Sequence, residues 1–370
     1  MKILYVITSL LMGGAEKLVV DLVPRLRSKG HVVDVAVFNG EDTPLMDKLK
    51  KEEPNTKIYK LGHNVYNPLL IFKLTRIMKQ YDIVHTHNSS PQLFTAIAGV
   101  LCSVELVSTE HNTSNRKRGW KWYAPIESWM YNRYSHTICI SKIAEDELRK
   151  YMGGDWIDSN TKKYNKISTI NNGVDIETIH KAIACKDLIK LKENRKAILM
   201  VAGFREAKDQ DTVVKTLSLL DKEKFEVWFA GIGNRENTVK KLTKDFNVSK
   251  RVRFLGMRTD IPNVLKAADY IVMASHWEGL SLSNVEGMSA GKPFIASDVN
   301  GLREVTKGYG LLFKESNVNE LKEIIHHLYK DKDFSKKIAQ RCFERAKQFD
   351  INKMVEGYNK IYNMVMNSKA

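Results

Sequence analysis

The sequence has few of the features that mark secreted, zinc-binding or membrane-spanning proteins. Its 370 residues include four cysteines, which are scattered and form no C-x-x-C pair. This usage argues for reduced thiols in a cytosolic compartment, and against a disulfide framework or a zinc site. No apolar run approaches the ~20 residues that a spanning helix needs. The apolar opening runs into Gly13-Gly14 without a cleavage pattern of small residues, so we expect a buried first strand rather than a signal peptide.

The sequence also has too few acidic residues to balance its basic ones. It carries 59 Lys and Arg against 43 Asp and Glu, a net charge of +16 at pH 7, and the excess is spread over both halves. Diffuse positive charge favours a negatively charged surface or substrate, either anionic lipid or nucleic acid, and charge alone does not choose between them. The apolar content of 43% is that of a globular protein.

Apolar runs alternate with helical patterns along the chain, which predicts parallel sheets with helices on both faces. A polar stretch at residues 153–163 interrupts this alternation, and a short apolar run after it ends at Asn171-Asn172-Gly173. We therefore predict an α/β protein of two doubly wound, Rossmann-like domains, residues 1–172 and 173–350. Residues 351–370 are expected to form a helix that crosses back to the first domain. The predicted strands are 2–8, 32–38, 83–87, 105–109, 137–140, 167–170, 197–201, 226–230, 253–255, 270–273 and 294–296.

The stretch from Ala274 to Glu304 carries the clearest chemical pattern. A strand-like run, a small-residue turn, a helical pattern and a second strand-like run predict a βαβ unit. Glu278 lies before the helix and Glu286 about one turn into it. Free N–H groups at a helix start attract phosphate, and a carboxylate accepts two hydroxyl hydrogen bonds at once. The pattern thus suits a phosphate flanked by two polyols, as in a nucleotide sugar. The alternative is a pair of solvated carboxylates near a helix end.

The spacing of Glu278 and Glu286, together with Gly279, Gly287 and Gly291, resembles the E-x7-E motif of retaining glycosyltransferases of family 4. These enzymes have the GT-B fold, in which two Rossmann-like domains face a cleft. The resemblance extends over nearly the whole chain, and the E-x7-E block is its specific part. It implies transfer of a sugar from a nucleoside-diphosphate donor with retention at the anomeric carbon. In most members no enzymic nucleophile takes part, and closure of the two domains assembles the site.

The resemblance implies donor contacts on both domains. Glu278 would bind donor-sugar hydroxyls, Glu286 the ribose, and Gly14 of the first domain the diphosphate. The phosphate-binding main chain is expected at Gly279, Leu280, Ser281, Leu282 and Ser283.

Cations for the diphosphate are implied in the stretch Leu199–Asp209. The family has an arginine followed five positions later by a lysine. Lys208 matches the lysine, whereas Gly203 stands where the arginine belongs. Arg205 is our candidate to supply the missing charge, since a lost cation would weaken stabilisation of the leaving group.

Further residues match the family at loops after other predicted strands. Gly231, in an incomplete G-x-G-x-x-G pattern, would line the phosphate or ribose, because the third glycine that NAD binding requires is absent. Arg258 would stack on the base. His111 matches a histidine that contacts the donor sugar or phosphate, and His87 is an alternative. We expect catalysis to depend on His111, Glu278 and Lys208.

Metal and cofactor signals are weak. His85-x-His87 has no accompanying carboxylate cluster. In another glycosyltransferase architecture a D-x-D triplet binds a divalent metal, and this chain has two, 209–211 and 331–333. Both open predicted helices, where Asp is a common N-cap, so we predict caps, no metal and no cofactor.

The segment from Asn115 to Tyr123 is the most distinctive surface candidate. Cations followed by interleaved aromatic residues suit an anionic membrane interface or single-stranded nucleic acid, and the alternative is a solvated loop that leads into a helix. The candidate membrane and acceptor residues are Arg116, Lys117, Arg118, Trp120 and Trp122.

The sequence therefore predicts a GT-B hexosyltransferase that uses a UDP-sugar and a glycan or lipid-linked glycan acceptor. We place it in the cytoplasm, peripheral at the inner face of the plasma membrane, in bacterial surface polysaccharide synthesis such as that of capsule or lipopolysaccharide. A UDP-sugar epimerase of the same fold and a basic nucleic-acid-binding protein are the alternatives. No nucleic acid partner is expected, because nucleic acid binding does not explain paired acids inside a phosphate-binding turn.

Overall fold

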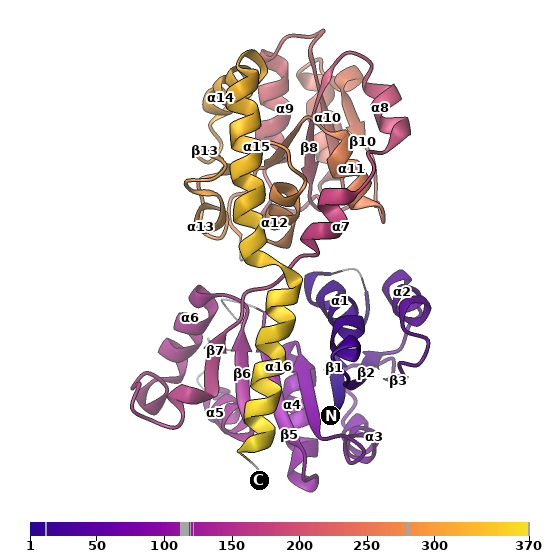
Figure 1. The fold of residues 1–370 in the computed structure, drawn as a ribbon, viewed down its shortest axis with the longest axis vertical. Coiled ribbons are helices and arrows are strands. Elements are labelled where there is room, and N and C mark those ends of the chain that lie inside the picture. Colours follow the sequence, from indigo (N-terminus) through magenta and orange to yellow (C-terminus); the bar gives the residue numbers. More distant parts are fainter. Residues whose placement is uncertain (12, 112–117, 119, 121, 279–280, 369–370) are drawn as a thin grey trace. The chain divides into compact units, whose positions relative to one another are not determined.

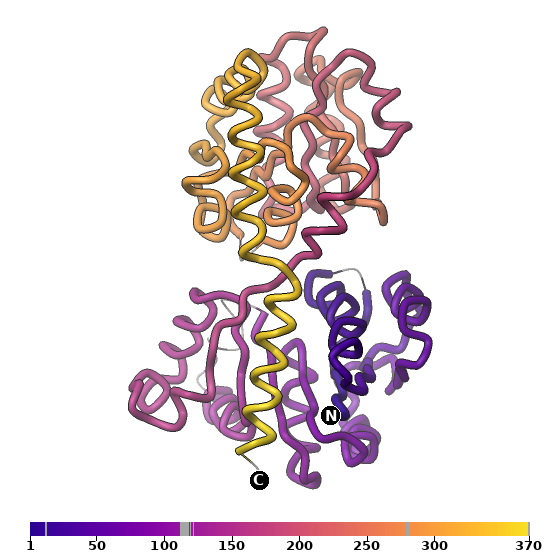
Figure 2. Tube along the Cα trace, viewed as in Figure 1, coloured from indigo at the N-terminus to yellow at the C-terminus, as the bar shows by residue number. Residues whose placement is uncertain are grey.

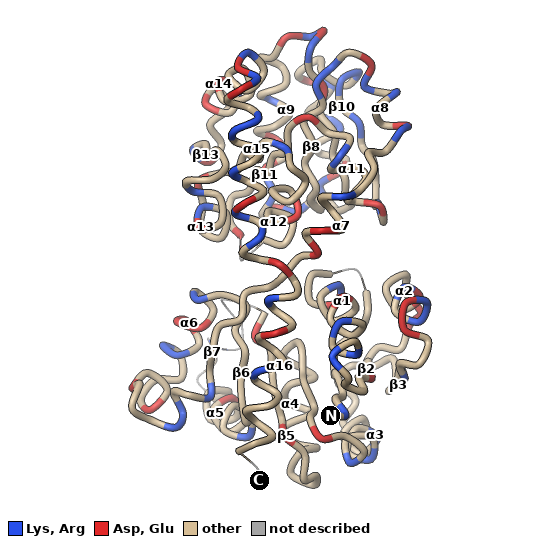
Figure 3. The backbone as a smooth tube through the Cα atoms, in the orientation of Figure 1, with Lys and Arg blue, Asp and Glu red and all other residues tan. Residues whose placement is uncertain are grey.

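The chain folds into two units, and its last helix belongs to the first of them (Figures 1 and 2). The computed structural model describes residues 1–370 except 12, 112–117, 119, 121, 279–280 and 369–370. Unit 1 consists of Met1–Gly173 and Ile351–Ala370, and unit 2 of Val174–Asp350. Lys and Arg residues are distributed over many elements of both units (Figure 3).

Unit 1 is built on a seven-stranded parallel sheet with the strand order β3-β2-β1-β4-β5-β6-β7. The first strand lies between β2 and β4, with Ile3 opposite Val33 on one side and Ile83 on the other. The strand order therefore reverses at β1, and ligands of such sheets bind beyond the carboxyl ends of the strands at this point. The strands are β1 (Lys2–Ile7), β2 (Val32–Asn39), β3 (Ile58–Gly62), β4 (Ile83–His87), β5 (Glu105–Glu110), β6 (His136–Cys139) and β7 (Ile167–Thr169).

Helices cover both faces of this sheet because side chains of each buried strand alternate between the faces. Tyr5 packs in the core beneath α1, α2 and α16, whereas Leu4 and Val6 face the core beneath α3, α4, α5 and α6. The helices are α1 (Gly14–Ser28), α2 (Pro44–Glu52), α3 (Leu70–Met78), α4 (Ser89–Ala98), α5 (Ala124–Arg133), α6 (Lys142–Met152) and α16 (Ile351–Asn367).

The C-terminal helix α16 is part of the unit 1 core. Its Tyr358 and Tyr362 are buried, and the Tyr362 hydroxyl lies 2.9 Å from the hydroxyl of Tyr5 on β1. Residues more than 350 positions apart in sequence therefore share one hydrogen bond, and the last turns of the chain complete the first domain.

Unit 2 contains a six-stranded parallel sheet with the order β10-β9-β8-β11-β12-β13, so its order reverses at β8. The strands are β8 (Lys196–Val201), β9 (Phe225–Ala230), β10 (Val252–Phe254), β11 (Tyr270–Met273), β12 (Phe294–Ser297) and β13 (Leu311–Phe313). The helices are α7 (Ile176–Lys181), α8 (Lys186–Lys192), α9 (Gln210–Leu219), α10 (Glu236–Asp245), α11 (Ile261–Ala267), α12 (Leu282–Ser289), α13 (Arg303–Thr306), α14 (Val318–Lys330) and α15 (Lys332–Ala346).

The predicted fold class of two α/β domains with parallel sheets is confirmed. The two D-x-D triplets act as predicted: Asp209 caps α9 by accepting from the Thr212 N–H, and Asp331 caps α15 by accepting from the Phe334 N–H. Two strands, β3 and β13, are absent from the predicted strands, and β13 has only three residues. Within the described residues, no helix combines the length and the apolar character needed to cross a bilayer.

Replacing Gly287 by Ala should destabilise unit 2. A Cβ there would lie 2.5 Å from the Phe294 ring and 3.0 Å from Ile271, because α12 packs directly against its sheet. Overpacking of this kind costs about 1–3 kcal/mol, which should lower the denaturation midpoint in urea. Gly14→Ala is the matched control, since its Cβ would meet nothing within 4 Å. Equal midpoints for Gly287→Ala and wild type would contradict the close packing of α12.

Candidate active site

The loops that follow β8 and β11 form the candidate site of unit 2. These two strands are neighbours at the point where the strand order reverses, so their carboxyl-end loops meet. Lys208 and Ser275 form an isolated antiparallel bridge, and the His276 N–H donates to the Ala207 carbonyl at 2.9 Å. The backbone thus ties the loop that carries Lys208 to the loop that carries Glu278.

Lys208 and Glu278 form an ion pair in this site, between Nζ and Oε1. Both side chains are largely buried, at 16% and 14% exposure, and the Ser275 hydroxyl donates to the same Oε1 at 3.1 Å. Burial lowers the pKa of Lys208 to about 8, and the positive charge of Arg205 acts in the same direction. The Glu278 carboxylate opposes both effects by favouring the charged ammonium. The arrangement holds a cation and an acid next to each other, with both side chains largely buried.

Arg205 lies beside Gly203, where the family arginine is missing. A Cβ built on Gly203 would lie 3.5 Å from Nε of Arg205. The Arg205 side chain therefore passes close to the point from which a side chain at position 203 would extend. Arg205 is exposed, and it is close enough to Lys208 to lower the pKa of that lysine. Two neighbouring cations of this kind make a site for an anion.

Glycines allow the loop after β9 to approach the loop after β8. Gly231 has a φ of +149°, and a Cβ there would collide with the Ala202 carbonyl. A Cβ at Gly233 would collide with the carbonyl of Phe204. Both glycines are therefore required by the close approach of the two loops, and Gly231 exposes bare backbone at the carboxyl edge of the sheet.

The helix α12 carries the second acid of the E-x7-E pattern. Glu286 is half-buried on this helix, which begins at Leu282. The side chain of the N-cap residue Ser281 does not accept a capping hydrogen bond from the described part of the helix, and Ser283 lies in the first turn. Gly279 and Leu280, which were also predicted to bind phosphate, lie outside the described residues.

Arg258 follows β10 at the same edge of the sheet. Its guanidinium donates two hydrogen bonds to the Asp260 carboxylate, at 2.7 and 2.6 Å. The ion pair fixes the plane of the guanidinium and leaves the flat face available for stacking. Arg258 is thus anchored by Asp260.

In unit 1 the predicted histidine lies at the carboxyl ends of β4 and β5. His111 Nε2 is 2.8 Å from His87 Nδ1, and the His87 ring stacks on that of His85 with centroids 4.6 Å apart. Burial lowers the pKa of His111 to about 4 and holds the pKa of His85 and of His87 well below the ordinary value. These imidazoles are therefore neutral at pH 7, and in the His87–His111 hydrogen bond one ring donates and the other accepts.

The inner histidine His85 is bound to α16 and β5. Its Nδ1 lies 2.6 Å from the Tyr362 hydroxyl and its Nε2 2.8 Å from the Thr109 hydroxyl. Because both ring nitrogens are engaged in this way, His85 cannot pair with His87 around a metal in this arrangement. Gly14, the other predicted residue of unit 1, is exposed and begins α1 just beyond β1.

The predicted membrane residues divide into different environments. Arg118 departs from the predicted exposed position: its side chain is 10% exposed and donates to the Glu110 carboxylate at 3.0 Å and to the Tyr131 hydroxyl. Trp120 and Trp122 are exposed and stack with ring centroids 5.5 Å apart. Arg116 and Lys117 lie outside the described residues.

Two residues beside predicted site residues, one in each unit, were not predicted from the sequence. Asn88 directly follows β4 and has a φ of +73°, a strained backbone of the kind that clusters at functional sites. Ser275 holds the Glu278 carboxylate. The sequence offered one signal for each residue. Asn88 directly follows a predicted strand, and Ser275 is a small polar residue shortly before Glu278.

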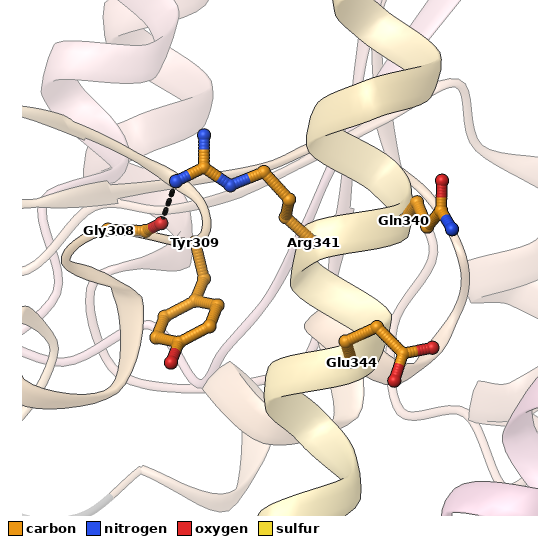
Figure 4. Close-up of a pocket in the computed structure, with 5 residues that line it drawn as sticks. All are labelled: Gly308, Tyr309, Gln340, Arg341 and Glu344. Carbon is orange, nitrogen blue, oxygen red and sulfur yellow. Dashed lines mark hydrogen bonds between the residues drawn. The ribbon is translucent and has the colours of Figure 1, made fainter.

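A pocket on unit 2 lies away from these loops (Figure 4). It is lined by Gly308 and Tyr309, which precede β13, and by Gln340, Arg341 and Glu344 of α15. The Arg341 guanidinium donates a hydrogen bond to the Gly308 carbonyl. Because this pocket adjoins the amino end of β13, whereas Lys208 and Glu278 follow carboxyl ends, we do not assign the donor to it.

Comparison with known proteins identifies the class. A family model described as Glycosyltransferase Family 4 matches residues 12–178, and one described as Glycosyl transferases group 1 matches residues 186–349. HepE of Anabaena, solved in complex with UDP-glucose, shares the fold with a TM-score of 0.82 at 21% identity over 98% of this chain and 99% of that one. The two parallel-sheet units are therefore those of a GT-B glycosyltransferase. The chain belongs to the family 4-like glycosyltransferases.

The names of two related enzymes state different substrates. The Escherichia coli UDP-Gal:alpha-D-GlcNAc-diphosphoundecaprenol alpha-1,3-galactosyltransferase is 29% identical over 315 residues, 80% of this chain and 79% of its own length. The Bacillus anthracis N-acetyl-alpha-D-glucosaminyl L-malate synthase is 22% identical over 381 residues, 96% of this chain and 95% of its own length.

The buried histidines should make stability fall with acid. Unfolded imidazoles take up protons near pH 6.5, whereas folded His111 does so only near pH 4. The unfolded chain thus binds more protons between these values, and the free energy of unfolding should drop as the pH is lowered from about 7 to 4. Each such histidine contributes a slope of at most about 1.4 kcal/mol per pH unit.

Urea denaturation of His111→Asn across this pH range checks this prediction. In this variant the free energy of unfolding should depend less steeply on pH, by an amount that corresponds to at most one proton. Tyr358→Phe is the control, since it changes a buried group nearby that does not titrate in this range, and it should keep the wild-type slope. If the unfolding free energy of His111→Asn depended on pH as steeply as that of wild type, the imidazole of His111 would not be held neutral in the folded protein.

Proposed function

We propose that this protein is a retaining, metal-independent hexosyltransferase that moves a sugar from a UDP-sugar to a hydroxyl of a glycan or lipid-linked glycan. The observation that carries the proposal is the Lys208–Glu278 pair, held by the backbone bridge between the loops after β8 and β11. A cation and an acid at one switch point match the two chemical ends of a nucleotide sugar, a diphosphate and a polyol.

The ion pair has a defined task in this mechanism. When the donor binds, its diphosphate takes the place of Glu278 as the partner of Lys208, and the released carboxylate accepts hydrogen bonds from sugar hydroxyls. A dianionic partner raises the pKa of Lys208 again, so that the lysine is fully charged where negative charge develops on the leaving diphosphate. Ser275 keeps the Glu278 carboxylate oriented during this exchange.

The remaining residues are assigned around this pair. Glu286 of α12 binds the ribose, and the start of α12 binds phosphate through its main chain. Gly231 and Arg258 line the nucleoside, with Arg258 held flat by Asp260. On unit 1, His111 contacts the donor sugar or phosphate as a neutral imidazole, and Gly14 the diphosphate. The acceptor hydroxyl attacks the face that the diphosphate leaves, and a phosphate oxygen takes its proton, so no enzymic nucleophile is needed.

The acceptor is proposed from the relatives and from the surface of unit 1. The Escherichia coli relative is named for a diphosphoundecaprenol-linked acceptor, and the Bacillus anthracis relative for malate. The exposed Trp120 and Trp122 favour a lipid-linked acceptor, since Trp is enriched where proteins meet a bilayer. We therefore propose a peripheral role at the inner face of the plasma membrane in the synthesis of a bacterial surface polysaccharide.

Thermal unfolding with UDP, GDP, ADP or NAD, each with magnesium or with a chelator, tests the donor. UDP should raise the midpoint equally with and without magnesium, because Lys208 and Arg205 neutralise the diphosphate. The shift should vanish in Glu286→Ala and persist in Glu323→Ala, a matched control on α14 whose acid is exposed and pairs with Lys322. A shift with NAD alone, or with no nucleotide, would overturn the proposal.

Arg205 should supply the cation that is missing at position 203. Arg205→Ala should weaken UDP binding about tenfold or more by calorimetry, since a charged hydrogen bond contributes about 1.5–3 kcal/mol. Arg341→Ala on α15 is the control and should leave the affinity unchanged. Adding Gly203→Arg to Arg205→Ala should restore part of the binding, because it returns a cation to the same loop, but the new Cβ would lie only 3.2 Å from the Ile232 carbonyl oxygen and that backbone must shift by a few tenths of an ångström. Undiminished binding by Arg205→Ala would remove Arg205 from the site.

A further inference from the structure

A buried histidine of unit 1, His87, has no part in the proposed transfer reaction. It ends β4 and is fully buried, and it points to the same face of the sheet as His85, because the two residues are two positions apart on one strand. The two rings stack, and the Tyr5 ring of the neighbouring β1 lies 5.2 Å from the His87 ring, nearly edge-on. These contacts fix the plane of the His87 imidazole.

His87 makes one hydrogen bond among the described residues, and one of its two nitrogens is left without a partner. Its Nδ1 lies 2.8 Å from Nε2 of His111. Its Nε2 is buried and meets no hydrogen-bonding group in the described part of the chain. His85 offers none, because its two nitrogens are bonded to the hydroxyls of Tyr362 and Thr109. Within the described residues, His111 is therefore the one polar group to which the His87 side chain is joined.

The unpaired nitrogen indicates the direction of the hydrogen bond between the two histidines. Burial lowers the pKa of both imidazoles, so each is neutral at pH 7 and carries one N–H. If His111 donated, the single proton of His87 would lie on Nε2, as a buried N–H without an acceptor. If His87 donates from Nδ1, its Nε2 is a bare lone pair. Buried N–H groups without an acceptor are rarer in proteins than under-satisfied acceptors, which favours donation by His87.

This direction determines which nitrogen of His111 carries its proton. An Nε2 that accepts from His87 is unprotonated, so the proton of His111 lies on Nδ1. His111 is half-buried, whereas His87 is fully buried, so a ligand meets His111 and meets it through Nδ1. Phosphate oxygens accept hydrogen bonds, and an N–H suits them. The opposite tautomer would turn a lone pair toward the anion.

We propose that His87 is a positioning residue for donor binding: it donates its Nδ1–H to Nε2 of His111, and His111 in turn donates its Nδ1–H to an anionic oxygen of the diphosphate. His87 touches no substrate in this arrangement, and it sets the tautomer of the residue that does. The inference deepens the proposed function and rests on its assignment of His111 to the donor.

Filling of the core is the alternative role for His87. A leucine would fill this apolar and aromatic surrounding without an unpaired nitrogen, whose burial lowers stability. The folding of unit 1 therefore does not require an imidazole at position 87, whereas the setting of a tautomer does.

Nuclear magnetic resonance of the full chain, isotope-labelled at its histidine nitrogens, tests the direction of the hydrogen bond. Protonated and unprotonated imidazole nitrogens differ widely in chemical shift, and the His111→Asn variant assigns the His111 signals. At pH 7, with and without UDP, His111 should be protonated on Nδ1 and not on Nε2. An Nε2 proton on His111 would overturn the proposal.

A second buried histidine of the same sheet serves as the control. The Nε2 of His136 lies 2.8 Å from the Ser168 hydroxyl, and its Nδ1 is buried and has no partner among the described residues. By the same reasoning His136 should carry its proton on Nε2, so the spectrum should contain both tautomers.

Two variants of similar size test what the hydrogen bond does. The amide of His87→Asn offers an N–H close to the position of the imidazole Nδ1, whereas His87→Leu offers none. His87→Leu should weaken UDP binding about tenfold by calorimetry, the effect of losing one hydrogen bond to a charged group. His87→Asn should recover most of the affinity, and His136→Leu should keep the affinity of wild type.

A double variant separates this role from a purely structural one. Because His87 acts through His111, adding His87→Leu to His111→Phe should cause no further loss of UDP affinity. An equal loss in both backgrounds, or wild-type affinity in His87→Leu, would overturn the proposal. Thermal unfolding shows whether each variant is folded, and the resonance measurement on wild type stays decisive if His87→Leu does not fold.

The outcomes distinguish this inference from the proposed function. A wild type that responds to UDP but carries the proton of His111 on Nε2 would overturn the inference alone. A wild type in which His111 is protonated on Nδ1, but which does not respond to UDP, would overturn the proposed donor alone.

Discussion

The close approach of backbone at the switch point of unit 2 is the constraint on which its candidate site depends. The loop after β8 lies between its neighbours: the Gly231 segment packs against the Ala202 carbonyl on one side, and Ser275 bridges Lys208 on the other. Side chains at Gly231 would push these loops apart and move Lys208 away from Glu278. The position of the ion pair is therefore set by backbone contacts, and the chemistry of the pair follows from a geometry that glycine makes possible.

Burial controls the charge state of the groups in both units, but with different results. Lys208 remains beside an acid and another cation, so its charge responds to whatever anion enters the loop. In unit 1 the histidines have no such carboxylate partner among the described contacts, and burial keeps them neutral. The Tyr362 hydroxyl of α16 holds His85, on which His87 stacks, so the C-terminal helix supports the ring that hydrogen-bonds to His111.

The sequence predicted the sheets better than the details of the site, and the reason is physical. Strands such as Tyr270–Met273 are continuous apolar runs, and parallel topology follows from their alternation with helices. The D-x-D triplets were recognised as caps because capping is a local property. The ion pair of Arg118 with Glu110 and the stacking of His87 on His85 join different elements, and no local pattern contains them. The three-residue strand β13 is too short for a periodic signal.

The net charge of +16 acts differently at the two proposed binding surfaces. At physiological ionic strength charges are screened beyond about 8 Å, so cations spread over both units cannot together hold one anion. A donor diphosphate is held by the cations that the β8 loop places within contact distance, and its binding depends on geometry. A bilayer presents many anions at once, so cations spread over a surface act additively there and need no fixed geometry. The exposed Trp120 and Trp122 must then provide the orientation that these cations lack, because Trp rings are suited to the head-group level of a bilayer.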